Sequence, residues 1–184
     1  MPLRFAALAA GLALVLSAGV TAHAQDAAPQ SLKGDALAAA FRSLGISFEA
    51  PADQPLVLMD SHDVYGGDAV AGARGDMVLL QQGGHPCQYA MVLDRAAAEF
   101  DFNRSNLVAG PTGVTHPVWT ATAMDANGHA LSSVGEAEIR SYSDVPAHRF
   151  ILSGPGITRV VFWGDDKGVD GFCNVVTDTV DVGY

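Results

Sequence analysis

Residues 117–138 read PVWTATAMDANGHALSSVGEAE, and this stretch decides the fold. Its most apolar residues from Trp119 to Ala123 fall at every second position, which is the spacing of side chains on one face of a β-strand. The Asn-Gly pair at 127–128 favours a tight hairpin turn, because both residue types tolerate positive backbone φ angles. The stretch therefore predicts a hairpin, with strands over 117–124 and about 129–138.

Further strands are predicted wherever a short apolar or alternating run is bounded by turn-forming residues. In the run 99–104, Phe100 and Phe102 are expected on one face and the polar groups on the other. Ser153–Gly156 is expected to form a turn between two strands, since it contains two glycines and a proline. Besides the hairpin, the expected strands cover 55–60, 77–82, 88–93, 99–104, 148–152, 157–163 and 173–182.

One short helix is expected before the strands. Asp35 is a favourable N-cap, Leu37 and Phe41 recur at helical spacing, and Gly45 ends the pattern. No helical pattern lies between consecutive strands, which argues against a parallel α/β sheet. The expected fold class is therefore all-β: an antiparallel jelly-roll β-sandwich with one short N-terminal helix.

The N-terminal sequence has the pattern of an export signal. Arg4 gives a positive start, an apolar run follows over 5–20, and Ala22-His23-Ala24 has the small-x-small pattern of a cleavage site. We expect residues 1–24 to be a signal peptide, 25–34 a flexible lead and 35–184 a single β-sandwich domain. The apolar run is short for a membrane span, and no second run is longer, so a periplasmic or secreted protein is predicted.

The composition excludes several classes of function. The chain has 184 residues, a net charge of -10, 16% charged residues and 49% hydrophobic residues, which is typical of a globular domain rather than a disordered chain. Nucleic acids attract clustered positive charge, and only ten residues are Lys or Arg. We therefore expect no nucleic-acid partner.

The two cysteines fit an exported chain. In an oxidising compartment an even pair favours a disulfide, here between Cys87 and Cys173. The alternative is a catalytic thiol at Cys87 assisted by His85, which would share its face on a strand. A single Cys-His pair has no third group to orient it, so the disulfide is favoured.

Acidic residues near the C-terminus are candidate calcium ligands. Asp165, Asp166 and Asp170 surround a Lys-Gly pair, and Ca²⁺ takes carboxylate and carbonyl oxygens on such turns. The alternative is a solvated turn of an acidic protein. Asp178 is in phase with apolar residues of the last strand, so it is expected to accept hydrogen bonds from a neighbouring loop or to bind calcium. No other cofactor is expected.

Four aromatic residues are candidates for stacking on sugars, because an amphipathic ring can cover an apolar sugar face while its edge stays wet. Trp119 and Trp163 lie within strand patterns and are expected in the core. Tyr65 and Tyr142 fall in expected loops and are the predicted ligand-binding residues. The sequence shows no Gly-x-Ser-x-Gly nucleophile elbow and no phosphate-binding loop.

Three C-terminal segments, 119–128, 150–162 and 174–178, carry a family resemblance. They combine an Asp-x-Asn-Gly hairpin, a strand ending at a Gly-rich turn, a strand with the pattern Val-x-Phe, and a last strand with an aspartate. In these features the chain resembles the jelly-roll domains, similar to galactose-binding modules, of secreted bacterial proteins. The resemblance covers about residues 100–182 and implies a non-catalytic surface or carbohydrate-binding module. Unlike the anchored members, this chain ends at Val182-Gly183-Tyr184 without a hydrophobic tail.

Three functions follow as hypotheses. The first is an exported, non-catalytic β-sandwich module that binds carbohydrate or the cell surface through loops or a concave sheet face. The second is a small secreted polysaccharide hydrolase, which requires two facing carboxylates, one with a raised pKa. The third is an interaction protein that binds an envelope component and takes no small-molecule ligand.

Overall fold

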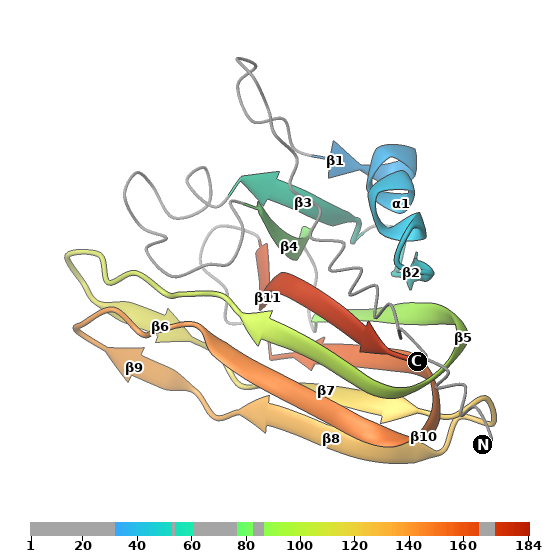
Figure 1. Cartoon of the computed structure of the whole chain (residues 1–184). Coiled ribbons are helices and arrows are strands. Elements are labelled where there is room, and N and C mark those ends of the chain that lie inside the picture. Colours follow the sequence, from blue (N-terminus) through green and yellow to red (C-terminus); the bar gives the residue numbers. More distant parts are fainter. Residues whose placement is uncertain (1–31, 53, 61–76, 83–86, 166–171) are drawn as a thin grey trace, which may run out of the picture.

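The computed structural model describes residues 32–52, 54–60, 77–82, 87–165 and 172–184, and these form an antiparallel β-sandwich with one short helix (Figure 1). The predicted all-β fold class is thereby confirmed. The elements are β1 Leu32–Lys33, α1 Gly34–Arg42, β2 Ile46–Glu49, β3 Leu56–Asp60, β4 Met77–Gln82, β5 Cys87–Arg104, β6 Val114–His116, β7 Trp119–Met124, β8 Ala130–Glu136, β9 Ile139–Ser141, β10 His148–Gly164 and β11 Phe172–Gly183.

A single ladder of strands folds over to make both layers of the sandwich. Its order is β1-β3-β4-β11-β5-β10-β7-β8, and β2 pairs with β5 outside this path. β5 and β10 have 18 and 17 residues and belong to both layers. On one side, residues 99–104 of β5 pair with β11 and with 148–153 of β10. On the other side, residues 90–93 of β5 pair with β2, and residues 159–164 of β10 pair with β7. We call the two sides the β11 layer and the β7 layer.

Two expected strand breaks are bends inside continuous strands. The predicted turn at Ser153–Gly156 is wrong, because β10 runs through it and pairs with β5 on both sides. A register shift between Ser153 and Ile157, with Gly156 at φ 83°, absorbs the change of direction. Likewise, the two strands expected at 88–93 and 99–104 are one strand, β5, and Figure 1 shows both long strands curving round at the same side of the molecule.

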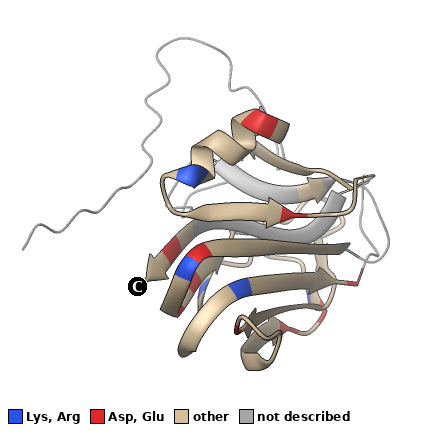
Figure 2. Cartoon of the chain, turned by 90° about the vertical axis from the view of Figure 1, so that its right-hand side faces the viewer, with Lys and Arg blue, Asp and Glu red and all other residues tan. Residues whose placement is uncertain are grey.

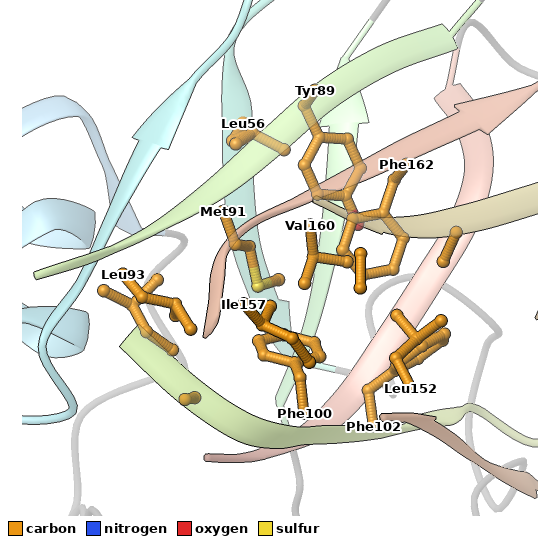
Figure 3. Packing of buried hydrophobic residues seen from close by; sticks show 14 of the residues in the cluster. Leu56, Tyr89, Met91, Leu93, Phe100, Phe102, Leu152, Ile157, Val160 and Phe162 are labelled. Atoms are coloured by element: carbon orange, nitrogen blue, oxygen red, sulfur yellow. The ribbon is translucent and has the colours of Figure 1, made fainter. Parts of the chain in front are cut away.

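The core fills the space between the layers. Phe100 and Phe102 are both fully buried, as predicted from their alternation. The Phe102 ring lies 5.8 Å from that of Trp119 and 5.1 Å from that of Phe162, so it joins β5, β7 and β10. Figure 3 shows the labelled core side chains of β5 and β10 gathered between the strands. Trp119 is 1% exposed, which confirms the core role predicted for it.

Four short elements complete the described chain. α1 buries Leu37, and its Phe41 ring contacts the Phe48 ring of β2 edge-on at 4.8 Å. β6 and β9 form a separate two-stranded ribbon beyond β7 and β8. These three-residue and four-residue strands are too short to give the periodic signal from which strands are predicted.

The predicted signal peptide, 1–24, and most of the predicted lead lie outside the described residues. Among the residues that are described, no helix has the length and apolar character needed to cross a membrane.

Candidate functional site

The outer face of the β7 layer carries an aromatic residue that the core does not use. Along β7 and the second half of β10, buried residues alternate with partly exposed ones. Val160 and Phe162 point into the core, so Trp163 between Phe162 and Gly164 lies on the opposite, outer face. The prediction that Trp163 packs in the core is therefore wrong. Val161 and Trp163 on the outer face are as apolar as Val160 and Phe162 on the inner one, so the hydrophobicity of these four residues does not show which face points inward.

Polar and small residues surround Trp163 on this face. The register places Gln88 of β5 and Thr120 of β7 directly opposite it, on either side. Gly135 of β8 lies opposite Thr120 and completes the row. Directly opposed residues in a sheet have Cβ atoms about 5 Å apart, so these side chains are neighbours of the indole.

A second row of the same face presents hydroxyl groups. Thr122 of β7 is opposite Ser133 of β8, and their side-chain oxygens are 3.0 Å apart. The Ser133 hydroxyl also donates to the Ala121 carbonyl oxygen at 3.2 Å, which fixes its position. We call the following set the Trp163 face: Gln88, Thr120, Thr122, Ser133, Gly135 and Trp163.

The close approach of β7 and β8 requires a glycine at position 135. A Cβ atom there would overlap the carbonyl oxygen of Trp119, because β7 and β8 approach closely. Because Gly135 has no side chain, nothing projects from β8 beside Thr120 on this face.

A buried ion pair holds the sandwich together at the end nearest Trp163. Arg104 donates to both carboxylate oxygens of Glu136, from Nε at 2.8 Å and from Nη2 at 3.1 Å. Trp119 Nε1 donates to the same carboxylate at 3.0 Å. Burial alone would raise the pKa of the Glu136 carboxyl, but the hydrogen bonds and charge of Arg104 hold that pKa below its ordinary value. The group is thus an ionised anchor between β5, β7 and β8.

The position of Arg104 contradicts the prediction that the polar side chains of 99–104 lie on the face opposite the phenylalanines. It has the same parity as Phe100 and Phe102 and is 2% exposed, on the inner face. Its Nη1 also donates to the carbonyl oxygens of Ser105 at 2.7 Å and Pro146 at 2.9 Å. The alternation itself contained this signal, since every second residue from Phe100 reaches Arg104.

The predicted ligand-binding residues, Tyr65 and Tyr142, stay a prediction. Tyr65 lies outside the described residues. Tyr142 follows β9 and is 92% exposed, beside Gly113 at the far end of the ribbon. Its chain neighbour Ser141 is opposite Val114 in the separate β6–β9 ribbon, whereas Trp163 lies in the nine-stranded sheet, opposite Thr120. Tyr142 and Trp163 are therefore separate aromatic positions.

The calcium ligands stay a prediction. Asp166 and Asp170 lie outside the described residues, and the Asp165 backbone N–H donates to the Val118 carbonyl oxygen at 2.9 Å. Asp178 falls at a register shift between Thr177 and Thr179, where strict alternation no longer holds. No group of three His, Cys, Asp or Glu side chains suited to a metal occurs within the part of the chain that the structure describes.

The disulfide also stays a prediction, but the backbone brings both cysteine positions towards one residue. Cys173 is opposite Gln81 in the β11–β4 pairing. The fully buried Gln81 side chain accepts a hydrogen bond from the Gln88 backbone N–H at 2.9 Å and donates to its carbonyl at 3.0 Å. Gln88 directly follows Cys87.

Comparisons with known proteins do not assign the chain to a family. No protein-family model matches the sequence, and no curated protein matches it. Among solved structures, the chain is similar to TmCBM61 in complex with β-1,4-galactotriose, with a TM-score of 0.42, 8% identity and coverage of 77% of this chain and 93% of that one. It is also similar to the K1 cleaved adhesin domain of Lys-gingipain from Porphyromonas gingivalis W83, with a TM-score of 0.39, 14% identity and coverage of 76% and 98%.

Larger proteins share the similarity over a part of their length. Arabinose-bound MgGH51 α-L-arabinofuranosidase has a TM-score of 0.42 and 12% identity over 86% of this chain. The enzymatically active domain of bacteriophage CBA120 tailspike protein 4 has a TM-score of 0.40 and 12% identity over 76% of it. The chain spans 25% and 19% of these two proteins respectively. The fold assignment rests on the strand register described above and not on these similarities.

Proposed function

We propose that this protein is an exported, non-catalytic β-sandwich module that binds carbohydrate on the Trp163 face. One observation carries the proposal: a partly exposed indole lies outside the core, on the outer face of a sheet, with amide and hydroxyl side chains at the directly opposed positions. The predicted signal peptide supports the export part of the proposal.

The chemistry of the face suits a sugar ring. A pyranose has an apolar C–H face that can cover an indole, and hydroxyl groups at its edge that need partners. Gln88 offers an amide donor and acceptor, and Thr120 offers a hydroxyl, one on each side of Trp163. Thr122 and Ser133 add hydroxyls one row further along the strands.

The face is also held rigidly. Its residues lie on paired strands, and the Arg104–Glu136 ion pair connects β5 to β8 on the inner side of the sandwich. A ligand that docks on a preformed surface does not have to order a loop, so less of the contact energy is lost on binding. This favours recognition by the sheet face over recognition by the exposed Tyr142 alone.

The test is to replace Trp163 by alanine and to measure binding to a panel of polysaccharides by affinity electrophoresis and calorimetry. Covering about 80 Å² of apolar indole surface contributes about 2 kcal/mol, so Kd should rise about 30-fold. Ile151→Ala, at an exposed apolar position of the β11 layer, is the matched control and should bind as the wild type. Because Trp163 lies outside the core, both variants should keep the wild-type circular dichroism spectrum.

Other results would redirect the proposal. If Tyr142→Ala loses binding while Trp163→Ala does not, the ligand docks at the tip of the β6–β9 ribbon. If the wild type binds no polysaccharide at all, an envelope interaction protein with no small-molecule ligand becomes the better hypothesis.

The hydrolase alternative finds no support among the described carboxylates. Asp101 and Asp181 are directly opposed on the outer face of the β11 layer, but Arg149 pairs with Asp101. A glycosidase acid needs a raised pKa. The described carboxyls with a shifted pKa, Glu136 and Asp125, are both shifted downward.

A further inference from the structure

We infer that the Trp163 face takes an uncharged glycan and that acidic polysaccharides are excluded by charge. This inference rests on the proposed function and names the ligand class for the same face. It starts from the arginines, because guanidinium groups are the side chains best suited to bind the carboxylate of a uronic acid.

Each arginine on the described strands already has a partner. On the outer side of the β7 layer, Arg159 Nη1 lies 2.6 Å from a carboxylate oxygen of Glu49. On the ribbon, Arg140 Nη2 lies 3.0 Å from Glu138. The remaining pairs are Arg104 with Glu136, Arg149 with Asp101, and Arg95 over the Tyr184 ring. Figure 2 shows basic and acidic segments side by side near the C-terminus.

Arg159 is the important case, because it shares a strand and a face with Trp163. Four positions separate the two residues, about 13 Å along β10. Glu49 reaches Arg159 from β2, where it is opposite Ala90, which is itself opposite Val161. An anionic sugar over Trp163 would have to displace the Glu49 carboxylate before it could use this guanidinium.

The net negative charge of the protein also disfavours an acidic ligand. The chain carries a net charge of -10, and Asp165 adds a carboxylate two residues beyond Trp163. A polyanion approaching the Trp163 face is repelled, whereas a neutral glycan meets no such barrier. The hydroxyls and the amide of the face can bind a neutral sugar without any counter-charge.

The experiment compares neutral polysaccharides, such as a galactan, a xylan and a β-glucan, with polygalacturonate and alginate at low and high salt. We expect the wild type to bind at least one neutral polymer with an affinity that salt hardly changes, and to bind both acidic polymers far more weakly at low salt. Tight binding of an acidic polymer that weakens as salt is added would overturn the inference.

The variant Glu49→Gln sharpens the test because it frees Arg159 and removes one negative charge. Its affinity for an acidic polymer at low salt should rise about three- to fivefold, the effect of one exposed ion pair. Asp181→Asn makes the same charge change on the β11 layer and should give no such gain. An equal gain in both variants would show that net charge, and not the Arg159–Glu49 pair, controls the selection.

The two proposals fail in different ways. If Trp163→Ala abolishes binding of an acidic polymer by the wild type, the proposed face is correct and the ligand class is wrong. If neutral binding occurs but survives Trp163→Ala, the proposed face is wrong.

Discussion

Replacing Arg104 by methionine tests whether the buried ion pair holds this end of the sandwich together. The Arg104 side chain is 3% exposed and makes four hydrogen bonds, two to Glu136 and one each to the carbonyl oxygens of Ser105 and Pro146. Methionine keeps most of the apolar stem but leaves the Glu136 carboxylate, 19% exposed, without this cation. The two carbonyl groups also lose a donor.

The size of the effect follows from that geometry. Removing one partner of a buried ion pair costs about 3–5 kcal/mol, since the other charge stays behind uncompensated. Glu136 keeps the Trp119 hydrogen bond and some contact with water, so we expect the lower end, about 3 kcal/mol. For a domain of this size, that loss lowers Tm by about 6–12 °C.

The double variant Arg104→Met with Glu136→Leu separates the unpaired charge from the lost packing. It should lie within about 1–2 kcal/mol of the wild type, because only the Trp119 N–H and two carbonyls then lack a partner. Urea unfolding followed by tryptophan fluorescence measures both variants. The reasoning is refuted if the double variant is as unstable as Arg104→Met, or if Arg104→Met loses less than about 1 kcal/mol.

The pH dependence gives a second readout of the same pair. The folded-state pKa of Glu136 lies below its ordinary value of 4.5, so the stability from the ionised carboxylate is fully present above that value. It is lost as the pH falls through the folded-state pKa. The stability difference between the wild type and Arg104→Met should therefore shrink in acid, and a difference that grows there would contradict the assignment.

Three further predictions concern the core, the hairpin and the cysteines. Phe102→Ala should cost about 3–5 kcal/mol in urea unfolding, because the fully buried ring contacts aromatic rings from several strands. Hydrogen bonds from the His129 backbone N–H and its ring lower the pKa of Asp125 from its ordinary value of 3.8, so the protection factor of the His129 amide, which compares its exchange rate with the intrinsic rate at the same pH, should fall as the pH drops through this lowered pKa. A protection factor that does not change would count against a role of the Asp125 carboxylate in holding the turn. Thiol titration of the denatured, unreduced protein should find no free thiol, whereas two titratable thiols would show that Cys87 and Cys173 are not joined.

The strands were predictable where polar and apolar residues alternate or where a turn signal is unambiguous. The hairpin is confirmed, with β7 at Trp119–Met124, β8 at Ala130–Glu136, and the Gly128 N–H bonded to the Asp125 carbonyl at 3.1 Å. β4 begins and ends where it was expected, at Met77 and Gln82. Local sequence is enough for the hairpin because its strand pairing is local, whereas β4 was found as a short apolar run although its partners β3 and β11 lie far away in sequence.

The bends and the Trp163 face were less accessible from the sequence. A Gly-Pro-Gly segment is compatible with a turn that ends a strand or with a bulge inside it, and only the pairing of β10 with β5 decides between them. The same holds for Trp163. Its strand has apolar residues on both faces. Which face points inward depends on the pairing of β10 with β7 and with residues 87–92 of β5, and both of these segments lie far away in sequence.

The sharing of β5 and β10 between the layers has a consequence for the order of events after synthesis. Residues 99–104 of β5 need β11 as a partner, and β11 comprises the twelve residues Phe172–Gly183. The middle of the sandwich therefore remains incomplete until Phe172–Gly183 has emerged from the ribosome. Contacts between such distant segments form slowly, which keeps the nascent polypeptide extended for longer than a chain of local hairpins would be. A translocation channel that accepts only unfolded substrates would have that interval in which to capture it.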